Sequence, residues 1–274
     1  PASKIRHMEI TVAADPVDYV FVGDSTTQYH VATSLLAVPT YNLGIPGTNL
    51  SQFASMALAA TNVSPDAVVL LIHPDVLYQR HWGWSGSEEI DDLIAVWQAE
   101  NTLRGRLSTI KQAAFASNRL ATASPIIIDL IARAYAAVEP GDATPVTSVE
   151  TLPGCQSPSA TTTEVGLVVR CQNGEGYILG GAVDETARTQ EVALNTIDPG
   201  KVRFLNALHD DLAQRGTRLI VMLQPRYRTA YQHNPERVAQ ALSADVLDLS
   251  HADIANDPQL WSDAVHLNAE GRTQ

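Results

Sequence analysis

Two short motifs, far apart in the sequence, carry side chains that together could perform acyl transfer. In "VFVGDS" an apolar run ends in a glycine turn with Ser25 directly after it, and in "DAVHLN" Asp263 stands three residues before His266. A serine hydroxyl becomes a nucleophile when an imidazole removes its proton, and a carboxylate on the other ring nitrogen fixes the imidazole tautomer. The residue types predict Ser25 as nucleophile, His266 as base and Asp263 as the acid that orients it.

Ser25 has a second interpretation, because serine and threonine often cap the first turn of a helix. The segment that follows, 26–37, has the spacing of apolar residues that is typical of a helix. Ser25 or Thr26 could therefore serve only as the N-cap. The motif by itself leaves both interpretations open.

Short apolar runs along the chain predict the elements that would position these residues. We expect buried strands at 18–24, 40–45, 66–74, 217–225 and 244–250, with helices between them. Parallel strands require crossover connections, so this alternation predicts an α/β fold with a central parallel sheet and helices on both faces. Ser25 would then lie at the carboxyl edge of the sheet, where open α/β sheets bind ligands.

The blocks "GDS", "NLGIPG" and "DAVHLN", in this order, resemble those of the SGNH/GDSL hydrolase superfamily, whose members are serine esterases. The resemblance covers about 15–78 and 201–274 and implies a flavodoxin-like, three-layer α/β/α fold. It also implies that Ser25 is the nucleophile and that Asp263 and His266 are the acid and base. No cofactor is implied.

The same resemblance implies an oxyanion hole, which stabilises the negative oxygen formed during acyl transfer. The family uses the serine N–H, a glycine N–H from the second block and an asparagine side chain from the third block. The first two correspond to Ser25 and Gly47, with Gly44 as an alternative. The third block, "LIHPDVL", has Pro74 in place of the asparagine. We expect His73 to supply the missing donor; Asn49 or a site with two donors are the alternatives.

Four further residues are candidates for substrate binding beside Asn49. The segment "YQRHWGWSG" would place Trp82 and Trp84 beside the pocket, where indole faces suit sugar rings or acyl chains; packing of the insertion onto the core is the alternative. Arg226 and Arg228 in "LQPRYR" follow a predicted strand and could hold an anionic group. Pairing with surface acids is the alternative for both.

The sequence divides into an SGNH-like catalytic core, 1–78 and 200–274, and a segment, 79–199, that lacks the strand–helix alternation. We interpret 79–199 as an insertion of helices and a β-hairpin that turns at Asn173-Gly174 and caps the sheet. Cys155 and Cys171, sixteen positions apart, are predicted to form a disulfide, with two unrelated reduced cysteines as the alternative. A disulfide would indicate an extracytoplasmic protein, periplasmic or secreted.

The composition of the chain argues against several classes of binding partner. The chain has 30 Asp and Glu against 18 Lys and Arg, with no basic cluster, which argues against nucleic acid as a partner. No apolar stretch is long enough to span a membrane. No metal site is expected, because the remaining histidines lack ligand spacing with cysteine or acid: His7, His30, His81, His209, His233 and His251.

These observations predict a serine esterase that acts on O-acyl esters, foremost O-acetyl esters, of cell-envelope or extracellular carbohydrate. Two alternatives remain open at this stage. An O-acyltransferase would use the same Ser25, His266 and Asp263, and a glycan-binding module would have lost efficient catalysis.

Overall fold

The computed structural model describes residues 2–48, 50–78, 144–145, 155, 159–163, 166–171, 175–180, 183, 186 and 188–273. The expected helices of the insertion, the turn at Asn173-Gly174, and the candidate residues Asn49, Trp82 and Trp84 lie outside these ranges. Among the described residues, no helix combines the length and the apolar character needed to cross a bilayer.

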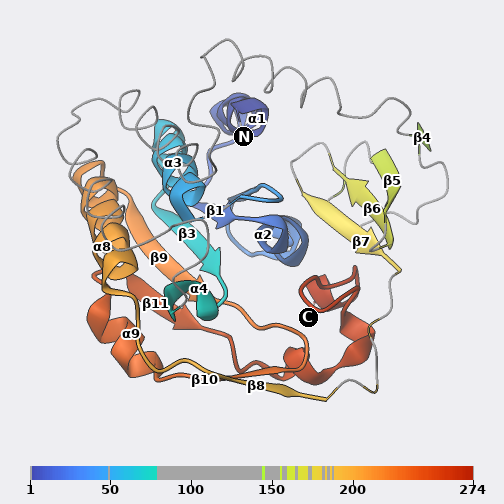
Figure 1. Ribbon diagram of the computed structural model, residues 1–274. Helices are drawn as coiled ribbons and strands as arrows, with labels where there is room; N and C mark the ends of the chain where they lie inside the picture. Colours follow the sequence, from blue (N-terminus) through green and yellow to red (C-terminus); the bar gives the residue numbers. More distant parts are fainter. Residues whose placement is uncertain are drawn as a thin grey trace, which may run out of the picture.

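A five-stranded parallel sheet forms the centre of the fold, in the order β11-β9-β3-β1-β2 (Figure 1). All five strands lie where the apolar runs predict them: β1 (Tyr19–Gly23), β2 (Thr40–Gly44), β3 (Ala67–Ile72), β9 (Arg218–Leu223) and β11 (Asp245–Asp248). Every residue of β3 is buried, as expected for the central strand of a parallel sheet that is covered on both faces.

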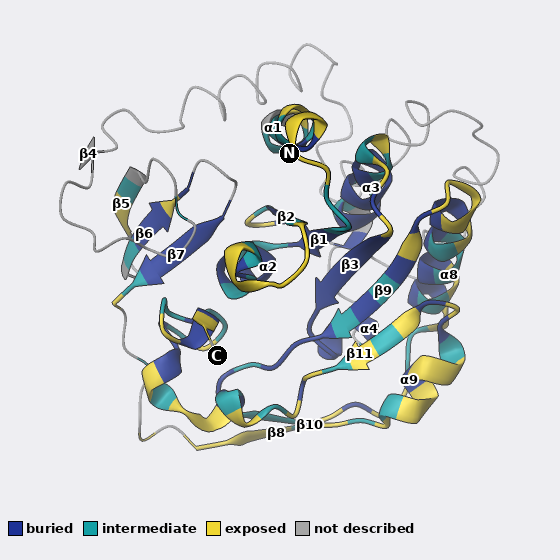
Figure 2. Ribbon diagram, turned by 180° about the vertical axis from the view of Figure 1, so that it is seen from behind, coloured by how far each residue is buried: buried dark blue, intermediate teal, exposed yellow. Residues whose placement is uncertain are grey.

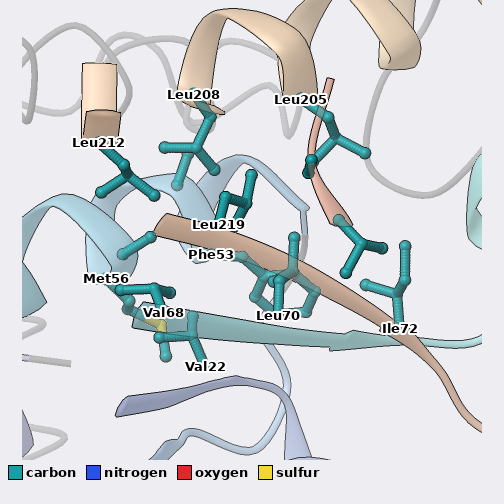
Figure 3. Packing of buried hydrophobic residues seen from close by; sticks show 14 of the residues in the cluster. Val22, Phe53, Met56, Val68, Leu70, Ile72, Leu205, Leu208, Leu212 and Leu219 are labelled. Atoms are coloured by element: carbon teal, nitrogen blue, oxygen red, sulfur yellow. The ribbon is translucent and has the colours of Figure 1, made fainter. Parts of the chain in front are cut away.

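Helices cover one face of this sheet and share a single hydrophobic core with it. They are α1 (Ala2–Ala14), α3 (Leu50–Ala60), α8 (Pro199–Gln214) and α9 (Pro235–Ala241). Figure 3 shows side chains of α3 and α8, such as Phe53 and Leu208, packed onto Val68 and Leu70 of β3. Alternate strand residues, Phe21 of β1 and Val69 and Leu71 of β3, form a separate cluster on the opposite face.

The second face is associated with α2 (Ser25–His30) and the C-terminal segment, which lie across the sheet from α3 and α8 in Figure 1. The structure therefore has a central parallel sheet with flanking helices, a three-layer α/β arrangement. The short α4 (Asp75–Tyr78) follows β3. Short 3₁₀ helices occupy 33–35, 61–63, 253–256, 258–260 and 271–273.

Two smaller sheets complete the described structure. One is antiparallel and contains β4 (Thr144–Pro145), β5 (Ser159–Thr163), β6 (Gly166–Arg170) and β7 (Gly176–Leu179). The antiparallel pairing of β6 with β7 confirms the expected hairpin. The other sheet pairs β8 (Gln190–Ala193) in parallel with β10 (Thr229–Gln232). Strand β8 is largely exposed (Figure 2), whereas Tyr231 of β10 is buried. The pairing joins β8, from the predicted insertion 79–199, to β10 of the core.

The disulfide between Cys155 and Cys171 is present, which confirms the predicted pairing. Cys171 directly follows β6, and its backbone N–H donates to the carbonyl of Glu175, 2.9 Å away, ahead of β7. The bridge therefore fastens residue 155 to the turn end of this hairpin. Val168 of β6 and Ile178 of β7 pack with Tyr29 of α2, so the small sheet contacts the helix that begins with Ser25.

Candidate active site

Ser25 is the first residue of α2, and the preceding residue caps that helix. The carboxylate of Asp24 accepts a hydrogen bond from the Thr26 backbone N–H at 2.9 Å and another from the Thr26 hydroxyl at 2.6 Å. Asp24 is therefore the N-cap. The capping interpretation of Ser25 and of Thr26 is wrong.

The hydroxyl of Ser25 lies against His266. His266 Nε2 is 2.8 Å from Ser25 Oγ, although the two residues are 241 positions apart. His266 Nδ1 is 2.8 Å from Asp263 Oδ2. The structure thus brings together the three residues that the motifs single out, in the linear arrangement Ser–His–Asp. We refer to them below as the triad.

A closed loop presents the two C-terminal members of the triad. Trp261 and Leu267 form a β-bridge across it, and the Ser262 N–H donates to the His266 carbonyl at 2.8 Å. Inside the loop, Asp263 Oδ1 accepts the backbone N–H groups of Val265 and His266, each at 2.8 Å. The carboxylate is therefore oriented by the main chain, and its second oxygen is directed at the imidazole.

These contacts determine the ionisation of Asp263 and the tautomer of His266. Burial alone would raise the pKa of Asp263, but the hydrogen bonds from His266 and from the Val265 N–H outweigh it and hold this pKa below its usual value. Asp263 is consequently ionised at neutral pH and accepts a hydrogen bond from the N–H at His266 Nδ1. His266 Nε2 is then left as the acceptor for the Ser25 hydroxyl, which is the tautomer that a general base requires.

Tyr29 of α2 holds the imidazole from one side. Its ring meets His266 edge to face, with the ring centroids 5.6 Å apart and the planes at 83°. Tyr29 is itself buried against Val168 and Ile178 of the small sheet. The small sheet therefore acts on the orientation of His266 through Tyr29.

Gly47 lies in a tight turn beyond β2. The Thr48 N–H donates to the Ile45 carbonyl at 3.3 Å, Pro46 occupies the second position and Gly47, with φ of 73°, the third. Proline followed by a residue of positive φ is typical of a type II turn. The alternative donor, the Gly44 N–H, is already bonded to Asn42 Oδ1 at 2.9 Å. Gly47 is therefore the better candidate for the oxyanion hole.

His73 follows β3 at the same sheet edge and is buried. Its Nδ1 lies 3.4 Å from the Gln224 carbonyl oxygen, a contact that requires a proton on Nδ1. Burial, with the charge of Arg226 next, keeps the pKa of His73 well below its usual value, so the ring is neutral. Nε2 then carries no proton, and it has no hydrogen-bond partner among the residues that the structure describes. This tautomer argues against His73 as a side-chain donor to an oxyanion.

Arg226, one of the two arginines singled out for substrate binding, pairs with a neighbouring acid. Its Nη1 lies 3.1 Å from Asp75 Oδ2, and the Asp75 side chain is almost fully buried. The alternative interpretation, pairing with an acid, therefore holds for Arg226, although the acid is not a surface residue. Arg228 stands 5.4 Å over the ring of Tyr227 and has a positive φ of 44°.

One group of potential metal ligands occurs in the described part of the chain: His233, Asp248 and His251, whose ligand atoms all lie within 4.8 Å of one another. Folding brings these residues together where sequence spacing gave no sign of it. His233 Nε2 is bonded to Asp248 Oδ2 at 2.7 Å, and the two imidazoles stack with centroids 5.2 Å apart. A metal-bound imidazole normally donates its other N–H to an acceptor. His233 Nδ1 has no such partner among the described residues.

Comparison with known proteins assigns the chain to no family. No model of a protein family matches the chain, and no curated protein is significantly similar to it in sequence.

Proposed function

We propose that this protein is a serine esterase of the SGNH/GDSL type. The observation that carries the proposal is the unbroken contact from Ser25 through His266 to Asp263, with both distances at 2.8 Å. Serine, imidazole and ionised carboxylate in this order form the arrangement that activates a hydroxyl for attack on an acyl group. Ser25 and His266 come from opposite ends of the α/β core, so the contact between them is not a local consequence of helix or turn geometry.

The reaction follows from the donor and acceptor roles in the site. Ser25 Oγ attacks the ester carbonyl carbon while its proton passes to His266 Nε2. The backbone N–H groups of Ser25 and Gly47 hold the resulting oxyanion. The carbonyl then re-forms, the bond to the alcohol oxygen breaks, and His266 returns the proton to that oxygen. Water, deprotonated by His266, releases the acid from Ser25 in the same two steps.

The arrangement of the sheet supports this proposal. Counted in chain order, its five strands lie in the order 2-1-3-4-5, with a change of winding direction between β1 and β3. Ligands of open α/β sheets bind at the carboxyl ends of the strands beside such a switch. Ser25 follows β1 there. The order is that of the flavodoxin-like fold, which the resemblance to SGNH hydrolases implies.

We infer O-acyl esters of carbohydrate, foremost O-acetyl esters, as the substrate class, and an extracytoplasmic location. The resemblance implies the first, and the disulfide between Cys155 and Cys171 supports the second, because disulfides persist in oxidising compartments.

Hydrolysis of p-nitrophenyl acetate, together with labelling by a fluorophosphonate probe, tests the esterase. Ser25→Ala abolishes both signals and His266→Ala reduces both by at least about 10³-fold, because nucleophile and base act as a unit. Ser243→Ala and His209→Ala are matched controls outside the triad. Ser243 is exposed, and His209 Nδ1 lies 3.1 Å from Asp210 Oδ1. Turnover and labelling that persist in Ser25→Ala would rule the mechanism out.

A further inference from the structure

A second connection joins the nucleophile turn to the base loop, separate from the triad itself. It begins next to His266, where the backbone N–H of Leu267 donates to His30 Nε2 at 3.1 Å. An N–H can donate only to an unprotonated nitrogen, so His30 carries its proton on Nδ1. That Nδ1 lies 3.1 Å from Gln224 Oε1 and donates to it. His30 therefore has a fixed tautomer, with both ring nitrogens in use.

The connection continues from Gln224 to the turn that holds Ser25. Gln224 is buried directly after β9, and its side-chain NH₂ donates to the hydroxyl of Thr26. The Thr26 hydroxyl in turn donates to Asp24 Oδ1 at 2.6 Å. All donors thus point in one direction, from Leu267 through His30, Gln224 and Thr26 to the Asp24 carboxylate. Hydrogen bonds aligned in this way polarise and strengthen one another.

The two ends of this network lie next to the reacting residues in the chain. Leu267 follows His266, while Asp24 and Thr26 flank Ser25 on either side. His266 lies on a loop, and loops move more readily than strands or helices. The network anchors that loop to β9 and α2, which are parts of the packed core.

Packing also fixes the central residue of the network. The rings of His30 and Trp261 meet edge to face, with centroids 5.8 Å apart and planes at 89°. Trp261 is fully buried and its Nε1 donates to the Ile254 carbonyl at 2.8 Å. His30 is therefore held by a rigid neighbour from the same segment that carries His266. Because both of its nitrogens are engaged, His30 is not available as a second base.

We propose that His30 and Gln224 are positioning residues, which set the separation and alignment of Ser25 Oγ and His266 Nε2. The proposal rests on the esterase function proposed above. A displacement of about 1 Å between reacting groups can cost about 10²-fold in rate. Loss of the network therefore lowers kcat, while substrate binding, and with it KM, is retained.

Three variants test the proposal in the full chain. His30→Phe keeps an aromatic ring against Trp261 but removes the hydrogen bonds to Leu267 and Gln224. Gln224→Met keeps the side-chain volume but removes the hydrogen bonds to His30 and Thr26. We expect each to lower kcat for p-nitrophenyl acetate by about 10- to 100-fold with KM within about threefold. His30→Gln, which can both accept and donate, restores part of kcat. His209→Phe, at a histidine outside the network that pairs with Asp210, leaves kcat unchanged.

A double-mutant cycle separates positioning from a general loss of stability. The cycle compares His30→Phe, Thr26→Val and the double variant. Because both residues act through one network, the fold-loss of kcat in the double variant is expected to be smaller than the product of the two single fold-losses. Full kcat in folded His30→Phe and Gln224→Met would overturn the proposal. So would equal losses of kcat in His30→Phe and His30→Gln.

A readout without substrate keeps this inference distinct from the esterase proposal. We expect the proton in the hydrogen bond between His266 Nδ1 and Asp263 to give a low-field signal in proton NMR spectra of the protein without substrate. We expect this signal to broaden or shift in His30→Phe and Gln224→Met, and to stay in place in His209→Phe. An unchanged signal in the first two variants argues against positioning, whereas a wild-type protein that neither turns over nor labels contradicts the esterase function instead.

Discussion

Arg272 and Glu175 form an ion pair, 2.7 Å from Nη2 to Oε2, in which neither side chain is exposed to solvent. Arg272 also donates to the carbonyls of Gly176 and Val31, and it lies 4.1 Å over the ring of Tyr177. The pair therefore ties the C-terminal segment to β7 and to the end of α2, around the loop that carries His266.

Removing one member of this pair is expected to be more damaging than removing both. Glu175→Leu leaves the buried Arg272 guanidinium without its counter-charge and should lower the free energy of unfolding by about 3–5 kcal/mol. Glu175→Leu/Arg272→Met removes the uncompensated charge and should recover part of this loss. Urea unfolding of the three proteins measures the difference, and a double variant no more stable than the single one would contradict the explanation.

Gly44→Ala tests how closely α2 approaches the sheet. A Cβ at this position would lie 2.3 Å from the backbone nitrogen of Gln28, so α2 must move away from β2. Because α2 begins with Ser25, we expect kcat for p-nitrophenyl acetate to fall at least about 10-fold along with the melting temperature. Gly216→Ala is the control: its Cβ meets open space, and its positive φ of 79° affects stability only. Equal activities in the two variants would exclude a role for this contact.

Asp263→Asn tests the tautomer of the base. An amide in place of the carboxylate can present an N–H to His266 Nδ1, which moves the imidazole proton to Nε2 and leaves no acceptor for the Ser25 hydroxyl. From the same change in other serine triads, kcat should fall by about 10⁴-fold while KM changes little. Steady-state kinetics measures the loss, and a fall below about 10-fold would mean that Asp263 does not orient the base.

Stability should decline as the pH falls from 7 to 5. Burial, and next the charge of His266, lower the pKa of His30 from 6.5 to about 3. Between these two values the unfolded chain binds a proton that the folded protein excludes, so the free energy of unfolding decreases with decreasing pH. The slope is about 1.4 kcal/mol per pH unit for each such histidine. His73, whose pKa is also lowered by burial, contributes in the same direction.

Urea unfolding at several pH values between 5 and 7 measures this slope. His30→Phe should make it shallower by about the contribution of one histidine. An identical slope in wild type and His30→Phe would show that His30 takes up its proton equally well in the folded protein.

The sequence was sufficient to locate the central sheet and the triad. Buried parallel strands such as 67–72 appear as uninterrupted apolar runs, and Asp263 and His266 are close enough in sequence to be recognised as a pair. Other features depend on long-range contacts. The helix expected over 26–37 ends at His30, because Asn42 on β2 donates its Nδ2 to the carbonyls of Thr27 and Val31 and draws the chain out of the helix.

Two helices were missed for different reasons. The start of α8 carries a recognisable signal, since Asp198 caps it and Pro199 is its first residue, but the expected boundary of the insertion at 199 obscured it. The expectation for residues 1–17 included no helix, although Met8 and Val12 of α1 are four apart and face the core. His30 and Gln224 could not be connected from sequence, because 194 positions separate them.

The distance along the chain between Ser25 and His266 has a consequence for biosynthesis. A ribosome that has just added Ser25 must add 241 more residues before the base exists. During that interval the Ser25 hydroxyl has no imidazole to remove its proton. The nucleophile is therefore activated only after the segment that carries His266 has been synthesised.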